Sequence, residues 1–166
     1  MTLLLFFSSD TGTAGRRERW IASSRSRVFI PVTRNGSEVV EKCVSTINTV
    51  CKHVEANDTY YVDLEPVLGT SETVSSITSV TPVDTTLTAG TGTVLSTATT
   101  VTRYERDTSG NTTTITYVIA ANKGCSFTLT GGATGAGCSV ITVKFVKSTG
   151  KSDAVDCLVE VHGVDV

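Results

Sequence analysis

Charged side chains are scarce in this chain of 166 residues, at 18% of the sequence. Globular chains carry about 25%, and here threonine, serine and glycine fill the deficit. The formal net charge is −2, so the chain as a whole has no electrostatic attraction to nucleic acid. A polar surface with few charges suits a protein that packs among other proteins or is exposed to harsh surroundings.

Long apolar runs are also missing. No stretch approaches the ~20 apolar residues of a membrane-spanning helix. The run at residues 3–7 is shorter than the about 7–15 apolar residues of a signal peptide, and the basic residues follow it instead of preceding it. We therefore interpret residues 3–7 as an anchoring segment or as part of an N-terminal arm, and we expect no contact with a membrane.

The cysteines and histidines lack the spacing of a metal site. Zinc needs about four ligands in close register, whereas the sequence has no Cys-x-x-Cys pair and its two histidines are far apart. The cysteines are interpreted first as small buried hydrophobic residues. A disulfide between Cys125 and Cys138, which flank a glycine-rich loop, is the alternative. The five cysteines are Cys43, Cys51, Cys125, Cys138 and Cys157.

A nucleophile and its base are not apparent either. Cys157 and His162 are five residues apart, which places them on opposite faces of a strand. Glycine-rich stretches such as 90–92 lack the Gly-Lys-Ser/Thr context of a phosphate loop. We therefore expect no catalytic residue, no cofactor and no metal, and we expect that the protein is not an enzyme.

Alternating valine, isoleucine and threonine residues dominate the chain from residue 57 onward. Alternation with a period of two marks strands that have one buried and one exposed face. In residues 139–147 it places Ile141, Val143, Phe145 and Lys147 on one face. Seven or eight short strands over about 100 residues predict an immunoglobulin-like antiparallel β-sandwich. The expected strands are 60–64, 74–80, 85–87, 94–104, 113–119, 125–129, 139–147 and 154–161.

The pattern divides the chain into three parts. Residues 1–34 lack a periodic apolar face and are expected to be an extended arm that becomes ordered on a partner, with a short edge strand near 27–32. Residues 35–56 form a connecting segment. Apolar residues at helical spacing in 37–55 favour a helix, while the β-branched residues there favour a strand, so both remain open. Residues 57–166 form the sandwich.

Basic residues concentrate in the N-terminal part. Residues 1–55 carry 8 basic and 5 acidic side chains, whereas the rest of the chain carries 6 and 11. An arginine cluster with one tryptophan suits docking on an acidic protein surface through Arg–carboxylate pairs. Contact with nucleic acid, with the tryptophan stacked on a base, and a solvated arm without a role are the alternatives. The candidate partner-binding residues are Arg16, Arg17, Arg19, Trp20, Arg25 and Arg27.

Three segments resemble the small immunoglobulin-like structural proteins of tailed bacteriophages. They are the first strand of the sandwich at 57–68, the strand at 73–80, and a final hairpin in which 139–145, the turn 148–153 and 157–161 follow one another. The resemblance covers residues 57–161. Proteins of this family are capsid cement or decoration proteins or appendages of tails and fibres, and none is an enzyme.

The resemblance implies a specific role and location. It implies a decoration protein on the capsid surface that binds the major capsid protein, or other virion proteins, and stabilises the shell. It also implies a homo-oligomer within the assembly. A tail or fibre component, or a surface adhesin module that binds carbohydrate or a receptor, is the alternative function.

Overall fold

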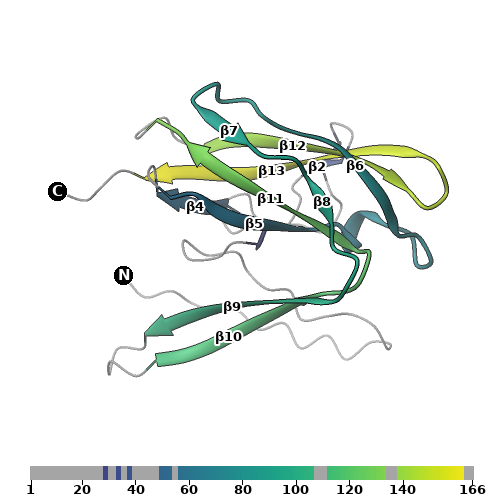
Figure 1. The fold of residues 1–166 in the computed structure, drawn as a ribbon, viewed down its shortest axis with the longest axis horizontal. Coiled ribbons are helices and arrows are strands. Elements are labelled where there is room, and N and C mark those ends of the chain that lie inside the picture. Colours follow the sequence, from purple (N-terminus) through teal and green to yellow (C-terminus); the bar gives the residue numbers. More distant parts are fainter. Residues whose placement is uncertain are drawn as a thin grey trace.

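The computed structural model describes residues 28–29, 33–34, 37–38, 49–53, 56–106, 112–133 and 138–162. The described residues form strands and one short 3-10 helix, Glu65–Val67, and they contain no α-helix. Two sheets stack on each other, and a two-stranded ribbon lies apart from them (Figure 1). The expectation that the chain is mainly β and built as a sandwich is confirmed, and its immunoglobulin-like topology stays a prediction.

The first sheet is centred on two strands, β5 and β11. Strand β5 pairs antiparallel with β11 and parallel with the short β1, and β11 also pairs with β7 and β8. The bounds are β1 Val28–Phe29, β5 Asp58–Asp63, β7 Leu87–Ala89, β8 Thr93–Val94 and β11 Gly124–Gly131.

The second sheet is centred on the hairpin of β12 and β13. Strand β6 extends the β12 side, while β2 and β4 share the outer edge of β13, with β3 next to β2. The hairpin register pairs Phe145 with Asp153, and Gly150 adopts a left-handed φ of 80° in the turn. The bounds are β2 Thr33–Arg34, β3 Ser37–Glu38, β4 Thr49–His53, β6 Val74–Pro82, β12 Cys138–Lys147 and β13 Ser152–His162.

The core lies between the two sheets, and the expected alternation sets it. Ile141, Val143 and Phe145 on β12 are fully buried, as predicted. Phe29 of β1 stacks on Phe127 of β11, with ring centroids 5.9 Å apart and an interplanar angle of 12°. One core cluster contains these two rings of the first sheet together with Ile141, Val143 and Phe145 of the second, which is how stacked sheets bury their apolar faces.

The helical alternative for the connecting segment is wrong where the structure describes it. Thr49–His53 is strand β4, which runs parallel to the second half of β13, and Ser37–Glu38 is strand β3. An unpaired edge of β13 offers backbone partners that a local apolar period does not reveal. Tertiary pairing therefore overrides the helical spacing.

The boundaries expected at residues 34 and 56 also differ from the structure. Val28 and Phe29 are fully buried, and Thr33–Arg34 pairs with β13, so the end of the expected arm belongs to the sheets. The short strand predicted near 27–32 is confirmed for Val28–Phe29. Residues 1–27 lie outside the described residues.

The strand expected over 94–104 is divided in two. Strand β8 ends at Val94, and β9, Thr99–Arg106, begins after a break. Leu95 lies at the start of the break and is still bonded to the segment at the start of β11: its N–H donates to the carbonyl of Gly124 and its carbonyl accepts from the N–H of Asn122. The chain therefore leaves the first sheet at Leu95 and enters the ribbon.

Candidate interaction surface

The arginine and tryptophan residues predicted to bind a partner lie outside the described residues. Arg16, Arg17, Arg19, Trp20, Arg25 and Arg27 all fall within residues 1–27. Their contribution to binding stays a prediction. The described part of the chain offers its own surfaces and polar clusters.

The most distinct surface is the ribbon of β9 and β10, Thr112–Ile119. Its two strands pair antiparallel without interruption from Ile119 opposite Thr99 to Thr112 opposite Arg106. In the part of the chain that the structure describes, these strands pair with no third strand. Figure 1 shows the ribbon below the two sheets and joined to them at one end.

The base of the ribbon packs on the outer face of the first sheet. Val101, Tyr117 and Ile119 join Leu95 and Val28 in a second apolar cluster, against which Tyr61 also packs. Side chains alternate across the first sheet, so Val28 faces this cluster while the neighbouring Phe29 faces the main core. This cluster, together with a hydrogen bond from the Tyr117 hydroxyl to Asp63, fixes the ribbon to the sandwich.

The opposite face of the ribbon is exposed. It carries four threonines and Val118, and 43% of Val118 is exposed to solvent. The five exposed side chains therefore offer hydroxyl and methyl groups and no charge, a combination that suits contact with another protein. The exposed residues are Thr100, Thr102, Thr114, Thr116 and Val118.

A second notable group is a buried ionic cluster at the turn end of the final hairpin. Lys147 Nζ lies 2.9 Å from Asp153 Oδ2 and 3.2 Å from Glu72 Oε2. The side chains of Lys147 and Asp153 are 5% and 2% exposed, while that of Glu72 is 22% exposed. Buried charges need such partners because removing an ion from water is costly.

The loop that carries Glu72 is held against the hairpin turn. The Gly69 N–H donates to Glu72 Oε2 at 2.8 Å, and the Ser148 N–H donates to the carbonyl of Thr73 at 2.8 Å. The Gly69 hydrogen bond, followed by the one from Lys147, lowers the pKa of Glu72. The Glu72 carboxylate is therefore ionised, and it lies at the partly exposed edge of the ionic cluster.

This cluster was not among the residues expected to be functional, although the sequence held a signal for it. The alternation in 139–147 already placed Lys147 on the face of Ile141, Val143 and Phe145, and a lysine among buried residues requires a partner. Asp153 is within reach because it belongs to the next strand. Glu72 is distant in sequence, and no local pattern reveals its contribution.

The described cysteines are free. Cys125 is buried in the first sheet and Cys138 is exposed at the start of β12 in the second sheet, so the disulfide considered between them is wrong. Burial raises the pKa of Cys125 to about 12 and that of Cys157 well above its usual value. Cys157 is buried while His162 is exposed, which confirms that the two do not face each other.

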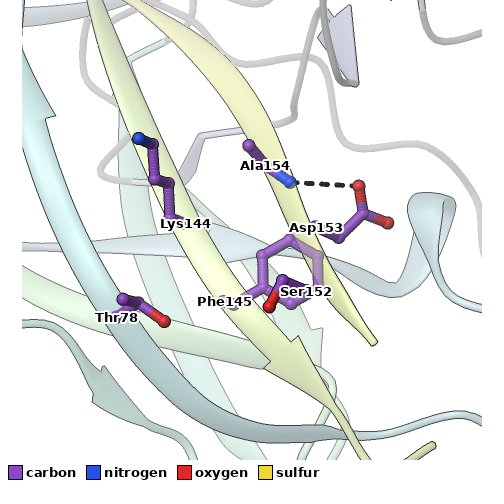
Figure 2. A pocket seen from close by; sticks show the side chains of 6 residues that line it. All are labelled: Thr78, Lys144, Phe145, Ser152, Asp153 and Ala154. Atoms are coloured by element: carbon purple, nitrogen blue, oxygen red, sulfur yellow. Dashed lines mark hydrogen bonds between the residues drawn. The ribbon is translucent and has the colours of Figure 1, made fainter. Parts of the chain in front are cut away.

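A shallow hollow lies on the outer side of the second sheet, beside an irregularity in the pairing of β6 with β12. The register of β12 with β6 shifts between Lys144 and Phe145, as a β-bulge does. Figure 2 shows the six residues that line the hollow, from strands β6, β12 and β13. They are Thr78, Lys144, Phe145, Ser152, Asp153 and Ala154.

Metal ligands and membrane-spanning helices are both absent from the described ranges. These ranges hold no group of three or more His, Cys, Asp or Glu residues arranged to bind a metal ion. They also hold no helix that is long and apolar enough to cross a membrane.

Comparison with known proteins adds no relative. No family model, no curated protein and no solved structure matches the chain.

Proposed function

We propose that the chain is a non-enzymatic structural protein of a tailed-phage virion with an immunoglobulin-like sandwich. Its role is that of a decoration protein which binds the shell of the major capsid protein and stabilises it. The resemblance of residues 57–161 to such proteins motivates this proposal, and the ribbon of β9 and β10 is the observation that carries it.

The ribbon supports a role in contacts between proteins for an energetic reason. A two-stranded hairpin is at best marginally stable in water by itself, and among the ribbon side chains that the structure describes, those packed on the sandwich lie at the base. The exposed face beyond this base gains stability when a neighbouring protein covers it. The ribbon has a fixed base, so it presents that face in one orientation at little entropic cost.

A shell multiplies such a contact. Each exposed patch of threonines and one valine contributes little, but copies related by the symmetry of the shell bind together with an increased effective concentration. The five exposed residues carry no charge, so we expect their contact to depend less on salt than contacts of the arginine-rich arm. The ribbon and the arginine-rich arm therefore make two different kinds of contact with the shell.

Co-sedimentation tests the proposal. Capsid shells of the phage that encodes the chain, stripped of accessory proteins, are mixed with the purified full chain. We expect saturable binding that Val118→Asp on the ribbon weakens at least tenfold. Val83→Asp is the matched control, because Val83 is exposed outside the ribbon, with 69% of its surface accessible, and this change should leave binding unaltered.

The alternatives give different results in the same experiment. Binding to purified tails but not to shells would replace the capsid assignment by a tail or fibre role. Binding to neither, together with saturable binding to a glycan array, would favour the adhesin module and contradict the proposal.

A further inference from the structure

We propose that Lys147 and Asp153 condense to form an intramolecular isopeptide bond, with Glu72 as the proton carrier. The final hairpin would then be closed by a covalent amide at its turn end. This is a modification site within the chain, and it does not depend on the proposed virion role.

The positions of the two reacting groups support condensation. Nζ of Lys147 and Oδ2 of Asp153 are 2.9 Å apart, and both side chains are nearly inaccessible to water. Two groups held at contact distance react as if at very high concentration. Both are directed to the interior by the alternation of β12 and β13, so the fold itself brings them together.

The surroundings supply a group that can carry protons and a hydrogen-bond donor for the negative charge that develops during the reaction. Glu72 Oε2 lies 3.2 Å from Lys147 Nζ, which is the nucleophilic atom, and this distance is short enough for proton transfer. The Ala154 N–H donates to Asp153 Oδ1 at 3.0 Å (Figure 2). Negative charge develops on Oδ1 when the amine attacks the carboxyl carbon, and this N–H stabilises it.

The reaction balances without any co-reactant. Glu72 accepts one proton from the Lys147 ammonium group, and Nζ then forms a bond with the Asp153 carboxyl carbon. The bond from this carbon to Oδ2 breaks, and the oxygen leaves as water with two of the three original ammonium protons. The third proton stays on the amide nitrogen, Glu72 regains its initial state, and no atom is oxidised or reduced.

Burial favours the product over the starting ion pair. Two charges that are costly to keep away from water are replaced by a neutral amide. The reverse reaction requires water at a bond whose two side chains are 5% and 2% exposed. The amide is therefore protected against hydrolysis once it has formed, and it holds the ends of β12 and β13 together under load or protease attack.

Peptide mapping of the purified, folded full chain tests the proposal. We expect the chain to weigh one water molecule less than its sequence requires. Trypsin should fail to cut after Lys147, so that the peptide 145–151 stays joined to the peptide beginning at Ser152. A mass equal to that of the sequence after prolonged incubation, with normal cleavage after Lys147, would overturn the proposal.

Loss of one water at Asp153 alone must be distinguished from formation of the isopeptide bond. A cyclic imide at Asp153 also removes one water, but it leaves cleavage after Lys147 intact and yields 145–147, 148–151 and the peptide beginning at Ser152 as three separate peptides. That result likewise rules out the isopeptide bond.

Three variants assign the roles. Lys147→Arg keeps the charge but cannot form the amide, and it should show the full sequence mass. Glu72→Gln should slow formation at least tenfold in refolded protein, and an unchanged rate would eliminate Glu72 as proton carrier. Lys144→Met, on the exposed face of the same strand, is the matched control and should retain the cross-link. The wild-type peptide map decides the question even where a variant does not fold.

Discussion

Tyr117 donates its hydroxyl hydrogen to Oδ2 of Asp63, and this bond joins the ribbon to the sandwich. Both residues are buried, at 9% and 2% exposure. Oδ1 of the same carboxylate accepts from the N–H of Glu65 at 3.0 Å, so Asp63 also holds the turn that follows β5. One buried carboxylate thus orients two neighbouring parts of the fold.

Replacing Tyr117 by phenylalanine should loosen the ribbon. The change keeps the ring but removes a hydrogen bond to a charged group, which is worth about 1.5–3 kcal/mol. We expect urea denaturation to show a loss of this size, and hydrogen exchange in β9 and β10 to accelerate more than in β12. Tyr61→Phe, at the edge of the same apolar cluster, is the control and should change stability little. Equal stability of both variants would contradict the assigned role of the hydroxyl.

Gly124 lies where the ribbon returns to the first sheet, and we expect that it cannot carry a side chain. A Cβ atom there would clash with the Val62 carbonyl oxygen and would lie 2.8 Å from a methyl carbon of Ile119. The Val62 contact involves backbone, which cannot rotate away, so Gly124→Ala should cost about 1–3 kcal/mol through overpacking. Thermal denaturation measures the loss.

Gly150 provides the matched glycine control. It has a φ of 80°, but a Cβ atom added there would have nothing within 4 Å, and asparagine tolerates this left-handed conformation. We expect Gly150→Asn to shift the melting temperature much less than Gly124→Ala. The reverse order would show that crowding at Gly124 is relieved by a local shift.

Thiol labelling should separate the described cysteines. Burial raises the pKa of Cys125 to about 12 and that of Cys157 well above its usual value, and the thiolate is the reactive form. We expect iodoacetamide at mildly alkaline pH to modify the exposed Cys138 and to leave Cys125 and Cys157 unmodified, as read by peptide mapping. In urea, all three should react at similar rates. Fast labelling of Cys157 in the native protein would contradict its burial.

Asp84 should make stability depend on acidity. The Thr86 hydroxyl donates to its carboxylate at 2.7 Å and the Thr86 N–H at 2.8 Å, and these bonds lower the pKa of Asp84 below its usual 3.8. A lowered folded-state pKa stabilises the protein above the unfolded-state value, and this contribution is lost as the pH falls through the folded-state value. We therefore expect Asp84→Asn to be less stable than the wild type at neutral pH.

The difference between these two proteins should disappear in acid. The free energies of unfolding are to be measured by urea titration from neutral pH to below 3.8, and the two curves should converge as the carboxylate is protonated. A constant difference over the whole range would show that Asp84 contributes through shape and not through charge.

The arginine cluster of the expected arm should act collectively. Exposed ion pairs contribute about 0–1 kcal/mol each, so a single Arg→Ala change should scarcely alter binding to shells. Replacement of all five arginines should abolish the salt-sensitive part of the binding. Full binding without them would exclude the arm as an anchor, and loss of DNA binding would favour the nucleic-acid alternative. The five are Arg16, Arg17, Arg19, Arg25 and Arg27.

Strand positions after residue 57 follow from the sequence because alternation is a local property. Residues that alternate between apolar and polar types form strands whose inward face is defined, and Ile141, Val143 and Phe145 lie inside as expected. The same alternation placed Lys147 on the inward face. The sequence by itself therefore determined the fold class, most strands of the sandwich and the alternation of the final hairpin.

Contacts between distant segments were decided only by the tertiary structure. Strand β4 forms because β13 provides an edge for Thr49–His53, and Leu95 is held at the first sheet by backbone bonds with Gly124 and Asn122, which are distant in sequence. Glu72 reaches Lys147 across 75 residues of sequence. Local periodicity reports which face of a strand is buried, but it carries no information on which distant backbone or side chain will meet that strand, because pairing depends on the assembled sheet.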